Sequence, residues 1–89
     1  MTVQVTDAGT VSSNGEYEEN GTNDRQPQYI DPNSGNILQY KSAWERWYIL
    51  DMTEEGYTYK TVVTDGTISP WELEWLVHFG SEPAPTVTA

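Results

Sequence analysis

Aromatic residues recur along this chain between short clusters of Gly, Asn and Asp, and this alternation limits its possible folds more than any other feature. The 89 residues include six Tyr, four Trp and one Phe but no Cys. Aromatic rings, which bury about 150–250 Å² each, must therefore build the core without disulfides. The turn-forming dipeptides Asn14-Gly15 and Asn20-Gly21 separate stretches of strand-like sequence. The pattern predicts one small, mainly β domain, folded as an antiparallel β-meander.

The strands of this meander follow from the alternation of apolar and polar residues between the turns. Pro32 and Gly35 suit a hairpin loop at 31–36, because Pro fixes φ at the second turn position and Gly takes the positive φ that closes the turn. We expect four to five strands, drawn from segments 2–6, 28–30, 36–40, 46–51 and 57–63.

Segments 46–51 and 57–63 are the most strand-like, because β-branched and aromatic residues dominate them. Successive side chains of a strand point to opposite faces of the sheet. The residues predicted to share a face are Trp47 with Ile49, Tyr48 with Leu50, and Tyr57 with Tyr59 and Thr61.

The pattern changes near the C-terminus, where Ser69 and Glu72 have the spacing of a helix capping box and Pro70 fits the first helical position. Trp71 and Trp75 are then four residues apart, on one face of a helix. The spacing predicts one short C-terminal helix over 70–79, ended by the glycine that follows and packed on the sheet.

The last nine residues contain Pro83 and Pro85, which disfavour a helix and favour extended backbone. We therefore divide the chain into a domain over 1–80 and an extended arm over 81–89. Two alternatives remain open for this arm. It is either disordered, or it docks on a neighbouring subunit, where the strand-like residues around Val87 would add to a sheet edge.

The charge of the chain excludes several partner classes. Its formal net charge is −10, which argues against a nucleic-acid backbone or an anionic membrane surface as partner. No apolar run approaches the roughly 20 residues that span a bilayer, and the N-terminus lacks the features of a signal peptide. Solubility through self-repulsion explains the charge, and attraction to a basic partner or mimicry of nucleic acid is the alternative. The only cations are Arg25, Lys41, Arg46 and Lys60.

No catalytic, cofactor or metal motif is present, and we expect no enzyme activity. The lone histidine, His78, falls late in the predicted helix and is interpreted as structural. A single helix covers only one face of a sheet, so some aromatic residues are expected to contact a partner, although core packing is the alternative for each. The candidate partner-binding residues are Trp44, Tyr48, Trp71, Pro83, Pro85 and Val87.

Several segments together resemble a known module. NGEYEENGTNDRQPQYI, ERWYILD, the Tyr57-x-Tyr59 pair and GSEPAPTVTA are similar to a small aromatic-rich β-module of bacteriophage virion proteins, which also occurs in tandem on surface and tail proteins. The similarity spans Val5 to Thr88. It departs at 24–27, where Asp-Arg-Gln-Pro replaces the commoner Asn-Gly-Lys-Pro, and at 71–79, which is richer in tryptophan.

The resemblance implies a non-enzymatic structural accessory of a virion, of the capsid decoration, cement or head-fibre type. Such a protein would bind a major capsid or tail protein through an aromatic patch and its two terminal arms, as a monomer or a homo-oligomer. One alternative is a module of a tail adhesin that binds carbohydrate on a host surface. A further alternative is an acidic inhibitor of a host nucleic-acid-binding protein.

Overall fold

The computed structural model describes residues 1–89 and contains eight strands and no α-helix. Two short 3₁₀ turns, η1 and η2, accompany the strands. The elements in chain order are β1 (Thr2–Thr6), η1 (Val11–Ser13), β2 (Gly15–Asn23), β3 (Gln26–Ile30), β4 (Ile37–Lys41), β5 (Arg46–Asp51), β6 (Gly56–Thr61), η2 (Pro70–Glu72), β7 (Trp75–Val77) and β8 (Thr86–Thr88).

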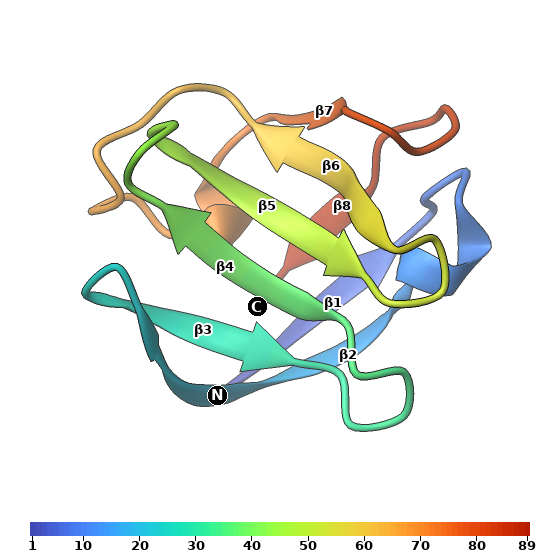
Figure 1. Ribbon diagram of the computed structural model, residues 1–89, viewed down its shortest axis with the longest axis horizontal. Helices are drawn as coiled ribbons and strands as arrows, with labels where there is room; N and C mark the ends of the chain where they lie inside the picture. Colours follow the sequence, from blue (N-terminus) through green and yellow to red (C-terminus); the bar gives the residue numbers. More distant parts are fainter.

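All eight strands form one antiparallel sheet that curls into a nearly closed barrel (Figure 1). The strand order is β7-β6-β5-β4-β3-β2-β1-β8, so that seven strands follow one another as a meander and β8 returns to pair with β1. The mainly β class is confirmed, but the prediction of four to five strands with a C-terminal helix is wrong.

Residues 70–79 do not form the predicted helix. Only Pro70–Glu72 make a 3₁₀ turn, and the Ser69 side chain accepts no capping hydrogen bond. Leu73 is already extended, at φ −112° and ψ 156°. Trp75–Val77 then pair with β6 as β7. A helix this short has little stability of its own. Strand pairing, in contrast, provides hydrogen-bond partners for the backbone groups of β6 and still places Trp75 in the core.

The C-terminal segment is extended, but it packs on its own chain. Val87 lies opposite Val5 in the antiparallel pairing of β8 with β1 and is 7% exposed. Upstream, the amide of Gly9 donates a hydrogen bond of 2.9 Å to the carbonyl of Pro83. Residues 81–89 therefore complete the sheet of the domain to which they belong.

The turns show where sequence signals succeed and where they fail. The loop predicted at 31–36 joins β3 to β4, as expected. The turn predicted at Asn20-Gly21 is instead an irregularity inside β2, where the register against β3 shifts between Glu19 and Thr22. The chain reverses later, at Asp24 and Arg25, which both have positive φ.

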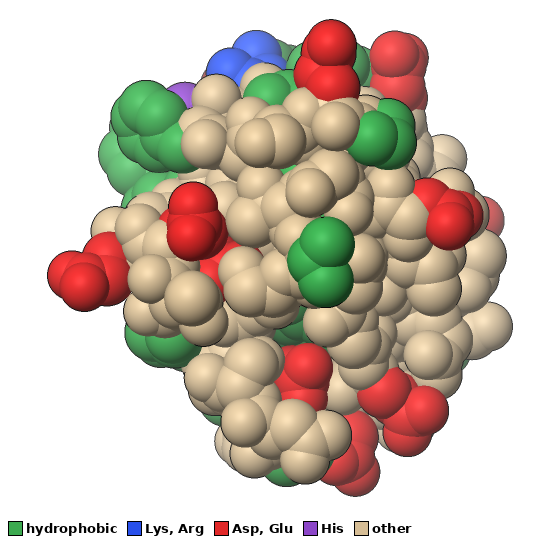
Figure 2. Space-filling model, turned by 90° about the vertical axis from the view of Figure 1, so that its right-hand side faces the viewer, with side chains coloured by type: hydrophobic (Ala, Val, Ile, Leu, Met, Phe, Trp, Pro, Cys, Tyr) green, Lys and Arg blue, Asp and Glu red, His purple; other side chains and the backbone are tan.

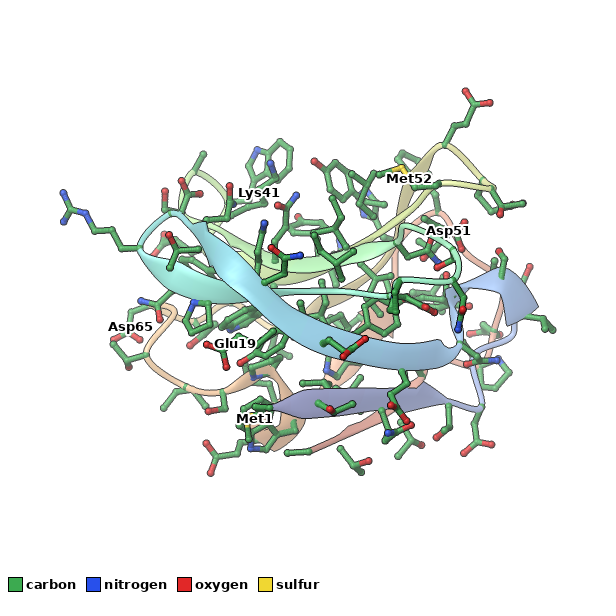
Figure 3. The ribbon with its side chains drawn as sticks, turned by 90° about the horizontal axis from the view of Figure 1, so that it is seen from below. Met1, Glu19, Lys41, Asp51, Met52 and Asp65 are labelled. Atoms are coloured by element: carbon green, nitrogen blue, oxygen red, sulfur yellow. The ribbon has the colours of Figure 1, made fainter.

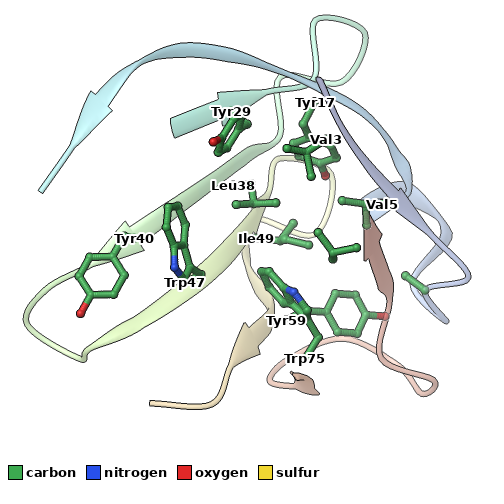
Figure 4. Close-up of a cluster of buried hydrophobic side chains, with 12 residues drawn as sticks. Val3, Val5, Tyr17, Tyr29, Leu38, Tyr40, Trp47, Ile49, Tyr59 and Trp75 are labelled. Carbon is green, nitrogen blue, oxygen red and sulfur yellow. The ribbon is translucent and has the colours of Figure 1, made fainter. Parts of the chain in front are cut away.

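The core is a cluster of twelve buried side chains inside the barrel (Figure 4). Trp47 and Ile49 share a face, as predicted, and both point into this core. Aromatic rings make up half of the cluster, which fits the expectation that rings replace disulfides here. Its members are Val3, Val5, Ala8, Tyr17, Tyr29, Leu38, Tyr40, Trp47, Ile49, Tyr59, Trp75 and Val87.

A buried carboxylate ties η1 to the hairpin between β5 and β6. Asp51 accepts hydrogen bonds from the hydroxyls of Ser13 (2.6 Å) and Ser12 (2.8 Å) and from the amides of Thr53 (2.9 Å) and Glu54 (3.0 Å). Burial alone would raise the pKa of Asp51, but these hydrogen bonds outweigh it and hold the pKa below its usual value.

The position of β8 leads to a stability prediction. Val87→Ala should lower the free energy of unfolding by about 1–3 kcal/mol, because it removes buried apolar surface between β8 and the core. Urea unfolding followed by tryptophan fluorescence measures this loss. Thr88→Ala, an exposed change on the same strand, should have little effect. Equal stabilities of the two variants would contradict a structural role for β8.

The Asp51 network leads to a pH prediction. The pKa of Asp51 is lower in the folded protein than in the unfolded chain, where it is about 3.9. The contribution of Asp51 to stability is therefore complete above the unfolded pKa and is lost as the pH falls through the folded pKa. Asp51→Asn should cost about 1–3 kcal/mol at pH 7 and flatten the fall in stability below pH ~4. Unfolding curves from pH 3 to 7, with exposed Glu18→Gln as control, test this. A slope unchanged by Asp51→Asn would contradict it.

Candidate functional site

The outer face of the barrel carries a hollow of about 310 Å³ over β5, β6 and the end of β7. Five ring-bearing side chains line it, and we call this set the aromatic patch. Its members are Trp44, Tyr48, Tyr57, His78 and Phe79.

Strand alternation and one irregularity place the first three rings. Tyr48 lies between the inward-facing Trp47 and Ile49 on β5 and therefore points outward. Trp44 projects from the turn between β4 and β5, where its amide donates to the carbonyl of Lys41 at 3.1 Å. Tyr57 also points outward, because the register between β5 and β6 shifts beside Leu50.

This shift corrects the prediction that Tyr57, Tyr59 and Thr61 share one face. Tyr59 and Thr61 are fully buried, whereas Tyr57 contacts Trp44 and Tyr48 on the outside. A β-bulge adds one residue to one strand of a pair, so that side chains beyond it change faces.

The other two rings follow β7. The amide of His78 donates to the carbonyl of Thr58 at 2.9 Å, and that of Phe79 donates to the carbonyl of Tyr57 at 3.2 Å. These bonds continue the pairing with β6 just beyond β7 and hold both rings at the border of the hollow. His78 and Phe79 are in contact, with 4.3 Å between ring centroids.

Tyr48 is the floor of the patch, and Trp44 and Phe79 are its walls. The Tyr48 ring makes edge contacts with Trp44 (5.3 Å), Tyr57 (5.2 Å) and His78 (5.7 Å). It is 5% exposed, whereas Trp44 is 53% and Phe79 77% exposed. The fixed contacts beneath and the exposed walls make the patch a concave apolar surface.

The polar atoms of the patch differ from those of the core in their hydrogen-bond partners. Most core hydroxyls and indole N–H groups donate to backbone carbonyls, as Tyr40 does to Thr64 at 2.6 Å and Trp47 to Ile68 at 3.1 Å. The hydroxyls of Tyr48 and Tyr57 and the indole N–H of Trp44 have no such partner in the chain. They remain free for hydrogen bonds with a ligand.

Positive charge gathers around this patch. The ammonium of Lys41 lies 5.6 Å from the centroid of the Tyr57 ring, and Figure 3 shows Lys41 on the upper side of the barrel, opposite Met1. Burial, followed by the charges of Lys60 and Arg46, lowers the pKa of His78, so this ring is neutral at pH 7. Figure 2 shows the histidine beside hydrophobic and basic side chains, with acidic side chains scattered over that face, one of them next to the basic side chains.

A row of polar side chains crosses the same face of the sheet. Gln39 lies directly opposite Tyr48 in the pairing of β4 with β5, and Lys60 lies opposite Tyr48 in the pairing of β5 with β6. Gln39, Tyr48 and Lys60 are thus neighbours on the outer face of the sheet. Gln39 is 7% exposed, whereas Lys60 is half-buried and offers a charged donor to a polar ligand.

The candidate residues chosen from the sequence separate into two groups. Trp44 and Tyr48 belong to the aromatic patch. Trp71 packs against the core and meets Tyr29 edge-on at 6.2 Å. The three C-terminal candidates lie away from the patch: Pro83 is exposed, whereas Pro85 and Val87 are buried.

Sequence reasoning did not select Tyr57, His78 or Phe79. Tyr57 was assigned to the face of Tyr59 because a bulge leaves no clear mark in the sequence. His78 and Phe79 were assigned to a helix, in which they would point in different directions. The available signal was the alternation of Leu73, Trp75 and Val77, which is the period of a strand as well as part of a helical pattern.

No protein-family model matches the chain, and neither a curated protein nor a solved structure matches it. The resemblance to phage modules therefore depends on the sequence motifs alone. No cluster of three or more His, Asp or Glu side chains is arranged to hold a metal ion. The structure contains no helix suited to crossing a bilayer.

Proposed function

We propose that this chain is a non-enzymatic binding module of a virion that recognises carbohydrate on a host surface through the aromatic patch. The observation that carries the proposal is the concave shape of the patch, whose five rings enclose about 310 Å³. This volume is at the lower end of the range for small-ligand sites and suits one sugar residue of a longer glycan.

The chemistry of the patch matches that of a sugar ring. One face of a pyranose presents C–H groups, which pack against aromatic rings, while its rim carries hydroxyls that need hydrogen-bond partners. The floor ring of Tyr48 and the exposed wall of Trp44 supply apolar contact. The free tyrosine hydroxyls, together with Lys60 on the same face, supply the hydrogen bonds.

A virion location is supported by the sequence resemblance, in which modules of this kind occur on phage virions and tails. Recognition of host glycans fits such a location, because many copies on one particle strengthen weak single contacts. An acidic chain also stays soluble before assembly.

The second candidate function is attachment to a capsid or tail lattice as a decoration or cement protein. It is favoured by the exposure of Phe79 and Trp44, since large exposed aromatic residues anchor protein interfaces. The expected attachment through a free C-terminal arm has less support, because β8 pairs within its own chain. A second copy of this chain is another possible partner for the same surface.

Inhibition of a nucleic-acid-binding protein has the least support. Mimicry of a nucleic acid requires carboxylates in an ordered row. Figure 2 shows them dispersed over one face instead.

The carbohydrate proposal predicts retention of the purified protein on immobilised host-surface glycans. Trp44→Ala should weaken retention about tenfold or more, because it removes an aromatic wall of the hollow. The control is Val11→Ser, which changes an exposed apolar side chain outside the patch, and thermal unfolding confirms that both variants are folded. Absence of retention on every glycan, or equal retention of the two variants, would overturn the proposal.

The lattice function predicts saturable co-sedimentation with virions or capsids that lack this protein, at a fixed copy ratio. Phe79→Ser should abolish it, because Phe79 is the most exposed ring of the patch, and Val11→Ser should not. If the wild-type protein stays in the supernatant, the lattice function is excluded.

A further inference from the structure

The cations of this chain are concentrated at one place on a strongly acidic molecule. Fourteen carboxylates face only four Lys and Arg residues. Three of these four, Lys41, Arg46 and Lys60, border the aromatic patch, and Arg25 lies in the turn between β2 and β3. The patch is therefore the most positively charged region of a chain whose net charge is −10.

These three cations are not paired with carboxylates of the chain. Their one side-chain hydrogen bond runs from Nη1 of Arg46 to the carbonyl of Thr61 at 3.2 Å. Lys41 lies over the ring of Tyr57, and Lys60 stands opposite Tyr48, the floor of the hollow. The ammonium of Lys41 thus lies against a ring that lines the hollow, Lys60 is the cross-strand neighbour of its floor, and neither lysine forms an ion pair within the chain.

We infer that the sugar residue held by the aromatic patch carries a carboxylate, as uronic and sialic acids do. Its apolar face packs on Tyr48 and Trp44, and its carboxylate accepts hydrogen bonds from Lys60 and Lys41. The inference rests on the proposed function and adds the class of saccharide. Hydrogen bonds between charged groups are stronger than those between neutral ones, so the carboxylate would dominate selectivity.

The same charges argue against a cationic ligand. A cage of aromatic rings is the usual site for quaternary ammonium groups, which the ring faces attract. Here Lys41 already lies over the Tyr57 ring at 5.6 Å, and Lys60 and Arg46 are close enough to His78 to lower its pKa. A ligand cation would be repelled by all three residues.

The overall charge of the protein does not prevent binding of an acidic glycan. At physiological ionic strength the Debye length is about 8 Å, so carboxylates elsewhere on the barrel are largely screened. The cations at the patch would touch the ligand directly and are screened much less. Local charge therefore decides the selectivity of the site.

The test compares a carboxylated oligosaccharide with its carboxyl-reduced form, which is neutral and otherwise identical. At about 0.15 M salt, the wild-type protein should bind the carboxylated form about tenfold more tightly. Lys60→Gln and Lys41→Gln should each remove most of this preference, because glutamine keeps a hydrogen-bond donor but carries no charge. Arg25→Gln makes the same charge change at the β2–β3 turn and should have no effect. Surface plasmon resonance provides both affinities.

The outcomes separate this inference from the proposed function. If the wild-type protein binds both forms with equal affinity and Lys60→Gln changes neither affinity, the carboxylate assignment is overturned while carbohydrate binding stands. Equal binding of a sulfated form of the same oligosaccharide likewise overturns the carboxylate assignment. Failure to bind any of the three forms, together with no retention on other glycans, overturns both.

Discussion

The structure depends on hydrogen bonds that buried aromatic side chains donate from their polar ends to the carbonyls of loops. Tyr59 is the clearest case, because its hydroxyl donates to Ser81 at 2.6 Å and accepts from the amide of Thr10 at 2.8 Å. One ring in the core thereby fixes two loops that are far apart in sequence. Trp75 likewise donates to Pro70 at 2.9 Å. Such bonds let a small barrel order long connections that have no regular structure of their own.

These bonds distinguish most core rings from the rings of the aromatic patch. Five core rings donate to carbonyls of the chain, whereas Tyr29 is a core ring whose hydroxyl has no partner there. Successive residues of β5 show the division, since Trp47 donates to Ile68 and Tyr48 has no partner. The face of the strand places Trp47 inside and Tyr48 outside, and only the folded chain shows which carbonyl lies within reach of each polar atom.

The same reasoning shows how much the sequence could predict. The strand 46–51 and the loop 31–36 were predicted correctly because alternation and turn chemistry are local properties. The predicted helix over 70–79 was wrong because the structure of this segment depends on a contact that is distant in sequence. Trp75–Val77 pair with the edge of β6 instead of forming a helix. The same holds for Val87, whose burial requires β1 as a partner. Two of the five residues of the aromatic patch were missed for this reason, since His78 and Phe79 directly follow the new strand.

His78 and Phe79 occupy a different part of the sheet from the floor of the patch. The motifs that resemble phage modules supply the core and the floor of the patch, including Tyr48 on a strand with neighbours on both sides. One wall comes from 71–79, where this chain departs from the resembling pattern, and it lies at the edge strand β7. Within this segment Trp75 is a core residue, whereas Phe79 is exposed, so a change at Phe79 disturbs few core contacts. The exposed walls of the patch lie beside the concentrated positive charge of the chain.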